Sequence, residues 1–229
     1  MGYILDGMSE AINLLLSLDK EVYSIILLSV FVSLTSTFIS TVLGIPIGFV
    51  LGVKKFKFKK LFTRVLNTSM SLPPVVVGLA IAILLSRRGP FGDYRLLFTP
   101  TAMIIAQTIL VLPITTGIIF NSAKVRGKSI IEICKTLGGS KRHMLLLFTL
   151  EMRRDIIIAI ATGFGRAISE VGAVMIVGGN IKGHTRVMTS FIAMNNSMGN
   201  YSMSIAMGLV LLLLAFLTNS ILQFAMAED

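Results

Sequence analysis

Residues 22–53 read VYSIILLSVFVSLTSTFISTVLGIPIGFVLGV, and no charged side chain interrupts them. A helix needs about 20 mostly apolar residues to cross a bilayer, so this stretch predicts a membrane-spanning helix with length to spare. The surplus leaves alternatives open: the helix tilts or projects into water, or Gly44, Pro46 and Gly48 break it. In each case the stretch predicts an integral membrane protein.

The rest of the chain repeats this pattern. Four further apolar runs occupy residues 65–86, 96–120, 156–179 and 203–227, which brings the expected spans to about five. Of the 229 residues, 54% are hydrophobic and only 14% are charged, whereas soluble domains carry about 25% charged residues. This composition excludes a disordered chain and disfavours a water-soluble enzyme. We therefore expect a single all-α integral membrane domain over residues 1–229.

The N-terminal residues show a different periodicity. Over residues 3–18, apolar side chains fall on one helical face, while acidic and amide side chains fall off it. This pattern predicts an amphipathic helix that lies at the membrane interface, and the alternative is a sixth, half-length span. No basic residue precedes Lys20, which argues against a cleaved signal peptide.

The basic residues are distributed unevenly among the connecting loops. The formal net charge of +10 would suggest nucleic acid in a soluble protein, but in a membrane protein it indicates basic cytoplasmic loops. The first and third loops carry most of these residues: Lys54, Lys55, Lys57, Lys59, Lys60 and Arg64, then Lys124, Arg126, Lys128, Lys135, Lys141, Arg142, Arg153 and Arg154. The positive-inside rule places both loops in the cytoplasm, the N-terminus outside and the C-terminus inside. We expect membrane lipid as a partner and no nucleic acid.

Residues that would mark catalysis or metal binding are scarce. Cys134 is the single cysteine, which excludes an internal disulfide and a cysteine-ligated zinc. His143 and His184 lie far apart in the chain, which disfavours a histidine metal cluster. Neither a Gly-x-x-x-x-Gly-Lys-Ser/Thr phosphate loop nor a His-Glu-x-x-His motif occurs. We expect no metal and no cofactor, so that energy must come from a partner chain.

The longest segment expected outside the membrane is residues 121–155. Apolar residues at helical spacing precede Gly138 and Gly139, and Ser140 suits the N-cap of a second helix. The segment therefore predicts a helix, a glycine turn and another helix. Short helices at a membrane surface can dock a soluble partner, and the alternative is a solvated connector with a basic face.

The spacing in this segment resembles the cytoplasmic loop motif of binding-protein-dependent ABC importer permeases, Glu-Ala-Ala, three residues, Gly, nine residues, Ile-x-Leu-Pro. Glu132 and Gly138 keep the first spacing, and Phe-Thr-Leu-Glu at 148–151 keeps the second, whereas the Ala-Ala pair and the final Pro are absent. The resemblance implies a coupling loop that contacts a cytoplasmic ATP-binding subunit. Its expected residues are Glu132, Leu137, Gly138, Gly139 and Leu150.

Two other stretches are similar to the molybdate, tungstate and sulfate branch of these permeases. They are Leu-Pro-Pro-Val-Val-Val-Gly at 72–78, with Arg-Arg-Gly-Pro-Phe-Gly at 87–92, and Gly-Arg-Ala-Ile-Ser-Glu-Val-Gly-Ala at 165–173, with Gly-Gly-Asn at 178–180. The continuation at 181–189 most resembles the tungstate members. The resemblance implies an ABC type I importer permease for tungstate that works by alternating access, with molybdate and sulfate as alternative substrates. It also implies a homodimer served by an extracytoplasmic oxyanion-binding protein.

The chain would then be a transport subunit and not an enzyme. The competing functions are an intramembrane enzyme that uses Glu170, His184 or Asp155, and a structural membrane anchor. The enzyme is disfavoured because these groups are expected at different depths, without a second acid or a metal nearby. The anchor accounts for a docking segment, but it accounts neither for prolines inside a span nor for charges there.

Residues within the expected spans indicate where a substrate would pass. Pro73 and Pro74 remove two backbone donors, so they predict a kink or a break beside a pathway, or else a kink that serves packing. Arg166 and Glu170 stand four residues apart on one helical face, close to Gly172, which suits either a structural ion pair or a gate.

The expected outer loop after the fourth span carries a further cluster. Lys182, His184 and Arg186 add positive potential that would attract an oxyanion to an outer mouth. We expect residues 185–195 to form a short helix that caps this mouth, and the alternative is an ordinary external loop.

Overall fold

The computed structural model describes residues 7–9, 12–13, 16 and 19–227. Their named elements are helices, as the composition predicts. They are α2 (Lys20–Val53), α3 (Lys59–Met70), α4 (Pro74–Leu85), the short 3-10 helix η1 (Gly92–Tyr94), α5 (Pro100–Thr136), α6 (Lys141–Glu151), α7 (Arg153–Ile168), α8 (Gly172–Gly178), α9 (Met188–Ser197) and α10 (Tyr201–Ala227). The interfacial helix expected at 3–18 lies for the most part outside the described residues.

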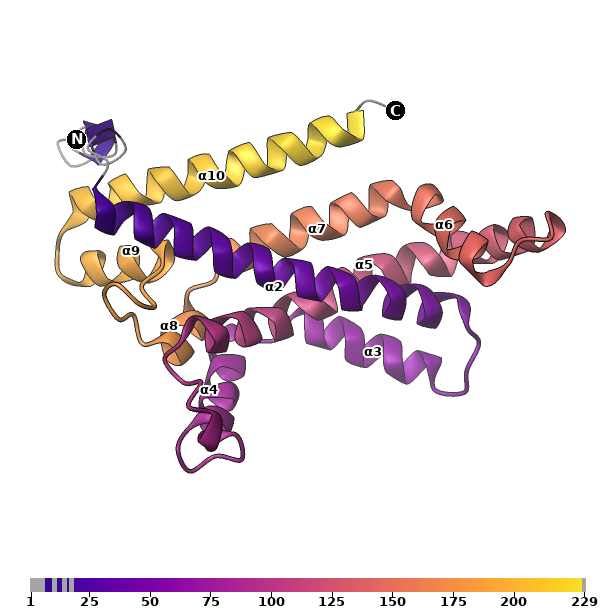
Figure 1. The fold of residues 1–229 in the computed structure, drawn as a ribbon, viewed down its shortest axis with the longest axis horizontal. Coiled ribbons are helices and arrows are strands. Elements are labelled where there is room, and N and C mark those ends of the chain that lie inside the picture. Colours follow the sequence, from indigo (N-terminus) through magenta and orange to yellow (C-terminus); the bar gives the residue numbers. More distant parts are fainter. Residues whose placement is uncertain (1–6, 10–11, 14–15, 17–18, 228–229) are drawn as a thin grey trace.

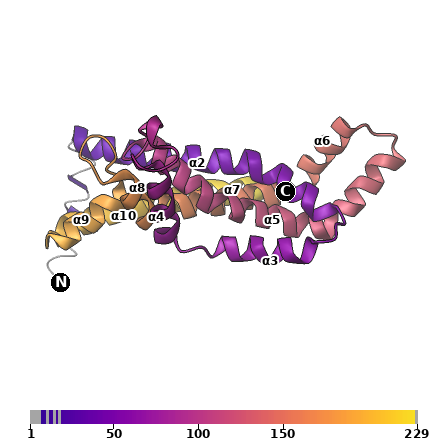
Figure 2. The same cartoon turned by 90° about the horizontal axis from the view of Figure 1, so that it is seen from below.

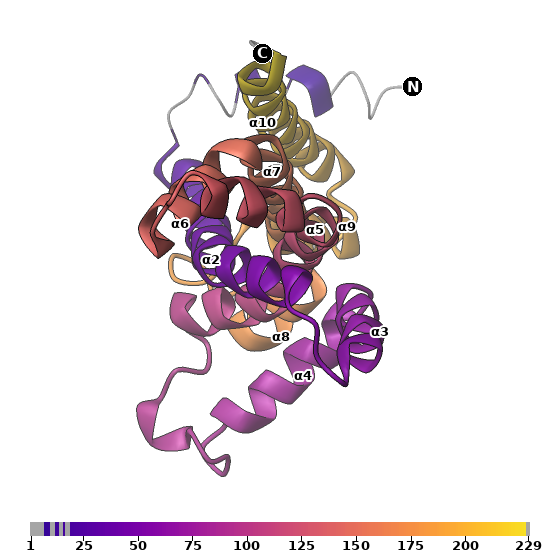
Figure 3. The ribbon, with the colours of Figure 1, turned by 90° about the vertical axis from the view of Figure 1, so that its right-hand side faces the viewer.

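The long helices α2, α5, α7 and α10 run along the longest axis of the molecule (Figure 1). Within the described residues, α2, α5 and α10 are long and apolar enough to cross a membrane, and two bent helix pairs bring the candidate spans to five. The pairs are α3 with α4, bent by 95°, and α7 with α8, bent by 58°. Viewed along the long axis, α4 leans away from the other helices (Figure 3).

The first apolar run forms one continuous helix, so the alternative that it breaks near Pro46 is wrong. Gly44, Gly48 and Gly52 instead form a stripe that packs against α5. An added Cβ at these glycines would lie 2.5–2.8 Å from the nearest α5 atom. Small residues let two membrane helices approach closely, and the resulting contact supports α2 on both sides of the missing Pro46 hydrogen bond.

The third apolar run also differs from its expected bounds. The helix α5 begins at Pro100, where the Thr99 side chain accepts a hydrogen bond from Ala102 N, and continues without interruption to Thr136. At about 1.5 Å per residue it is about 55 Å long, well beyond the roughly 30 Å of a hydrocarbon core. Residues 121–136, expected as the start of a separate loop, therefore extend a spanning helix. The end of α5 and α6 project together beyond the other helices (Figure 2).

The second and fourth runs are each divided into two helices. Pro73 and Pro74 separate α3 from α4, and Pro74 occupies the first turn of α4, where its missing N–H has no intrahelical partner to lose. Residues 169–171, hereafter the elbow, separate α7 from α8. The short helix expected at 185–195 is present as α9, shifted toward the C-terminus because Val187 is its N-cap.

Candidate functional site

The two bent pairs meet through their second helices, α4 and α8. A Cβ added to Gly78 of α4 would lie 2.7 Å from Ala173 Cα, and one added to Gly172 would lie 2.8 Å from the Val75 side chain. The structure thus brings the helix after the Pro73–Pro74 break into contact with Gly172. Much of α4 is uncovered within this chain, because its large apolar side chains include five exposed ones, Val75, Val76, Leu79, Ile83 and Leu84.

Arg166 and Glu170 form the ion pair that their spacing predicts. Arg166 Nη1 lies 2.5 Å from Glu170 Oε2, and the two side chains are 30% and 3% exposed. The other carboxylate oxygen, Oε1, accepts a hydrogen bond of 3.0 Å from Ala173 N in the first turn of α8. The carboxylate therefore links the end of α7 to the start of α8, where an anionic group is favoured by the helix dipole.

Three further residues, from α2, α5 and α9, connect the elbow and the end of α7 to their neighbours. Gln107 Nε2 of α5 donates to Ala167 O over 3.0 Å, and Ser36 Oγ of α2 donates to Gln107 Oε1 over 3.0 Å. Thr189 Oγ1 of α9 donates to Glu170 O over 2.8 Å. A glutamine within an apolar span was a usable signal, since polar side chains there face the bundle interior and find partners.

The space at the elbow is small. A cavity of about 10 Å³ is lined by Ser29, Ser33, Gln107, Glu170 and Thr189 together with apolar neighbours. This volume suits about one water molecule. A tetrahedral dianion does not fit there, and the Glu170 carboxylate would repel it. In this conformation the Glu170 carboxylate therefore accepts a backbone hydrogen bond from α8 and does not line an open anion path.

The coupling loop predicted from the glycine spacing forms a turn at the far end of α5. Gly138 adopts φ +66°, a left-handed conformation that glycine adopts at low cost, and Gly139 N donates to Cys134 O over 2.8 Å. Ser140 caps α6 by accepting a hydrogen bond from His143 N. The predicted order of helix, glycine turn and helix is confirmed, and we call residues 137–140 the coupling turn.

An apolar hollow of about 380 Å³ opens beside this turn. Its lining includes Leu137, Gly138, Gly139 and Leu150, four of the five residues expected in the coupling loop, together with Cys134, His143, Leu146 and Leu147. Leu137, Leu146 and Leu150 are 79%, 60% and 57% exposed. Glu132, the fifth expected residue, is exposed on α5 but does not line the hollow.

The inner face of α6 is anchored to the rest of the protein. Phe148 is buried and packs against Phe49 of α2, with ring centroids 3.8 Å apart and ring planes tilted by 39°. Asp155 at the start of α7 accepts a hydrogen bond from Ser122 and pairs with Arg126, both on α5. The exposed leucines are therefore held at a defined position at the end of the molecule.

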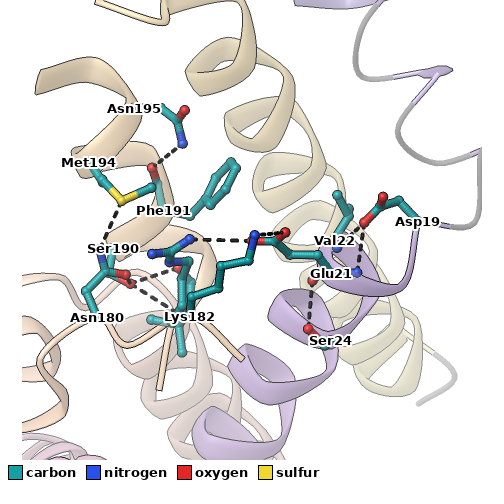
Figure 4. A network of polar contacts seen from close by, with 12 residues as sticks. Asp19, Glu21, Val22, Ser24, Asn180, Lys182, Ser190, Phe191, Met194 and Asn195 are labelled. Carbon is teal, nitrogen blue, oxygen red and sulfur yellow. Dashed lines mark hydrogen bonds and ion pairs between the residues drawn. The ribbon is translucent and has the colours of Figure 1, made fainter. Parts of the chain in front are cut away.

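The basic residues expected at the outer mouth lie beside an acidic residue from the beginning of α2. Glu21 Oε2 lies 2.7 Å from Lys182 Nζ, and Glu21 Oε1 lies 3.4 Å from Arg186 Nη1 (Figure 4). Part of the predicted positive potential is thus neutralised. His184 is exposed on the same loop. The loop is tied down further by Asn180 Oδ1, which accepts from Ser190 Oγ of α9 over 2.9 Å.

Groups of three or more His, Cys, Asp or Glu side chains that would hold a metal ion are not found among the residues described. The polar side chains of the elbow are engaged in hydrogen bonds to backbone and to one another. The arrangement suits the mechanical linkage of helices rather than bond-breaking chemistry.

Comparison with known proteins agrees with this geometry. Residues 44–225 match the family described as binding-protein-dependent transport system inner membrane component. The chain is 54% identical to the tungstate uptake system permease protein TupB of Peptoclostridium acidaminophilum over 229 residues, which cover 100% of both chains. It is 38% identical to TupB of Campylobacter jejuni over 96% of this chain and 92% of that protein, and 39% identical to a probable anion ABC transporter permease protein of Haloferax volcanii over 86% and 88%. The chain belongs to the binding-protein-dependent transport system inner membrane component family.

Proposed function

We propose that this chain is the membrane-spanning permease subunit of an ATP-driven, binding-protein-dependent importer of tungstate. The observation that carries the substrate is the 54% identity, over the whole chain, to a protein named as a tungstate uptake permease. The molybdenum and sulfate permeases among the relatives are less similar, at 28% and 30% identity. Molybdate, also a tetrahedral dianion, is the second candidate substrate.

The proposed energy input is at the coupling turn. The exposed leucines around the apolar hollow would be costly in water and are suited to an apolar surface of a soluble partner. The family supplies that partner, an ATP-binding subunit. In the proposed cycle, ATP-driven closure of two such subunits moves Leu137, Gly138, Gly139 and Leu150, with Glu132 at the rim of the contact. The helices then alternate between openings to the two sides of the membrane.

The proposed gate comprises the two broken spans. Pro73 and Pro74 interrupt the helix, so that α4 is bent by 95° from the axis of α3. The Arg166–Glu170 pair fixes the direction of α8, which contacts α4 through Gly172. The uncovered face of α4 supports a homodimer, in which a second copy would complete the pathway. A water-filled path is tolerated beside irregular backbone, whereas lipid is not.

The proposed entry is at the other end of the molecule, beside Lys182, His184 and Arg186. An extracytoplasmic binding protein would release its oxyanion there, and the two cations beside Glu21 would raise the local anion concentration. This assignment follows the orientation given by the basic loops, with the N-terminus outside and α6 in the cytoplasm.

The test is elemental mass spectrometry of cells with and without this chain, supplied with equal trace tungstate and molybdate. Selective loss of tungsten supports the proposal, and equal loss of both metals supports a shared oxyanion importer. Loss of neither, in cells without a second uptake system, contradicts it, and sulfate uptake is then measured.

The coupling turn is tested in the same cells. Glu132→Lys and Gly138→Asp should abolish uptake while the assembled complex still hydrolyses ATP. Val125→Lys, a substitution on the same helix at a site 80% exposed and outside the lining of the hollow, is the matched control and should transport normally. Normal uptake by both coupling-turn variants, at normal membrane abundance, would refute the assignment of this turn.

A further inference from the structure

The helix α5 joins the two proposed working parts of the permease. It passes the end of α7 at Gln107 and ends at the coupling turn, without a break over Pro100–Thr136. From Gln107 to Thr136 the rise is about 43 Å. Pro113 lies between these two residues and removes one hydrogen bond of the helix. The glycine stripe of α2 packs against α5 directly after Pro113, at Thr115 and Thr116, and supports the helix there, so we treat the two helices as one unit. A displacement of the coupling turn is therefore passed along α5 with little loss to bending.

Gln107 is the residue through which α5 contacts the end of α7, directly before the elbow. Its side chain is 4% exposed, and its Nε2 donates to Ala167 O over 3.0 Å. In an unbroken helix Ala167 O would accept a hydrogen bond from the N–H of Val171, but the elbow interrupts that pattern and Glu170 N donates to it instead, over 3.1 Å. The Gln107 amide thus supplies a second donor to a carbonyl at the end of α7 that lies away from water.

The contact continues from the elbow into the outer half of the molecule. Glu170 follows Ala167 by three residues and binds the first turn of α8 through its carboxylate. The helix α8 then carries α4 through the close approach of Gly78 to Ala173. The series therefore consists of two hydrogen bonds, Gln107 to Ala167 and Ala173 to Glu170, and one close helix contact, Gly78 with Ala173.

We propose that Gln107 is a positioning residue that transmits the movement of the coupling turn, through α5, to the elbow and from there to α8 and α4. The inference rests on the proposed function, because it assumes that an ATP-binding subunit moves the coupling turn. It adds the connection between that movement and the gate. Coupling between two sites requires a contact that moves with the first site and changes the conformational equilibrium of the second. In the proposal, the Gln107–Ala167 hydrogen bond moves with α5 and the coupling turn, and it changes the equilibrium of the gate formed by α8 and α4.

The test uses the complete transporter in lipid vesicles, with its ATP-binding subunit and binding protein, and tungstate as the transported ion. In Gln107→Leu and Gln107→Met the side chain keeps its approximate size but loses the donor to Ala167 O. We expect ATP hydrolysis close to the wild-type rate, but about tenfold fewer tungstate ions imported per ATP, within the usual range of allosteric coupling.

The matched control is Thr108→Val. Thr108 is the next residue on α5, its hydroxyl is buried, and that hydroxyl has no hydrogen-bond partner among the described residues. This variant removes a buried polar atom from the same turn without touching the elbow, and it should transport normally. Ser36→Ala removes the hydrogen bond to Gln107 Oε1 but leaves the donor to Ala167 in place, so its effect should be small.

A second readout separates transmission from a purely structural role. Amide hydrogen exchange of residues 168–174 is measured with and without ATP trapping. In the wild type, trapping should change exchange at the elbow. In both Gln107 variants, exchange at the coupling turn should still change, while exchange at the elbow should no longer respond.

The results distinguish the two ideas. If the wild type transports tungstate and the Gln107 variants match Thr108→Val in both readouts, Gln107 does not transmit and the proposed function stands. If the Gln107 variants lose ATP hydrolysis together with transport, the role is structural and the inference is overturned. If the wild type neither imports tungstate nor responds to ATP, the proposed function itself fails.

Discussion

Replacement of Glu170 by alanine removes a buried carboxylate that serves two helices at once. Its Oε2 pairs with Arg166 at the end of α7, and its Oε1 accepts from Ala173 N at the start of α8. Because α7 and α8 diverge by 58°, the backbone between them cannot satisfy itself by continuing a helix. Glu170→Ala therefore leaves an unsatisfied N–H and a cation without its partner.

The size of the effect follows from the burial of the two groups. An unsatisfied buried N–H costs about 1–3 kcal/mol. The Arg166 side chain is 30% exposed and can turn toward water, so the lost ion pair adds only about 1 kcal/mol. We expect Glu170→Ala to destabilise the protein by about 2–4 kcal/mol, or roughly 5–15 °C in apparent melting temperature for a chain of this size. Glu170→Gln keeps an oxygen for Ala173 N and should cost about 1 kcal/mol.

The assay is thermal unfolding of the two variants and the wild type in one detergent, with elemental uptake measured in parallel. Glu170→Gln should retain at least half of the stability that Glu170→Ala loses. If the two variants are equally destabilised, the charge and not the helix cap holds the elbow, and the reasoning is wrong. If neither is destabilised, the elbow does not depend on this carboxylate.

Further predictions concern other contacts. Gly48→Ala should destabilise the protein by about 1–3 kcal/mol in thermal unfolding, because the added Cβ would lie 2.7 Å from a backbone oxygen of α5. Gly208 has open space around it, so the control Gly208→Ala should be neutral or stabilising. Equal melting temperatures of the two variants would show that the contact of Gly48 with α5 does not limit stability. Glu21→Lys should lower uptake, because it breaks the ion pair that holds the loop of Lys182 to α2. The double variant Glu21→Lys with Lys182→Glu restores an ion pair and should recover part of the lost uptake; absence of any recovery would contradict this role of the pair. Lys59→Met removes the donor to Gly52 O in the last turn of α2 and to Lys54 O directly after it, and should cost about 0.5–1.5 kcal/mol in the same unfolding assay because these hydrogen bonds are only part-buried or exposed; an unchanged melting temperature would show that this cap is dispensable.

Features that depend on neighbouring residues were predictable from the sequence. Gly138 and Ser140 predicted the turn and the cap between α5 and α6, since a left-handed residue and an N-cap are both local requirements. The pairing of Arg166 with Glu170 followed from a spacing of four residues on a helix. The two prolines at 73 and 74 predicted the break before α4, because proline cannot supply the missing donors.

Contacts between distant residues were not predictable in this way. Pro46 and its neighbouring glycines suggested a break, but α2 is continuous because those glycines pack on α5. The donation by Gln107 to Ala167 O joins residues 60 positions apart, and no local rule pairs them. The same holds for Glu21 and Lys182, which become partners only when the outer loop folds back onto the start of α2.

By itself the sequence determined that this is a helical membrane protein, that prolines interrupt the helix before α4, and that a glycine turn and a capped helix follow α5. These properties depend on hydropathy, on backbone donors and on the φ preference of glycine, each of which acts over a few residues. Only the tertiary structure decided that α5 runs unbroken from Pro100 to the coupling turn and that Gln107 binds Ala167 O at the end of α7. The physical reason is that a buried carbonyl takes whichever donor the packing of other helices brings within about 3 Å.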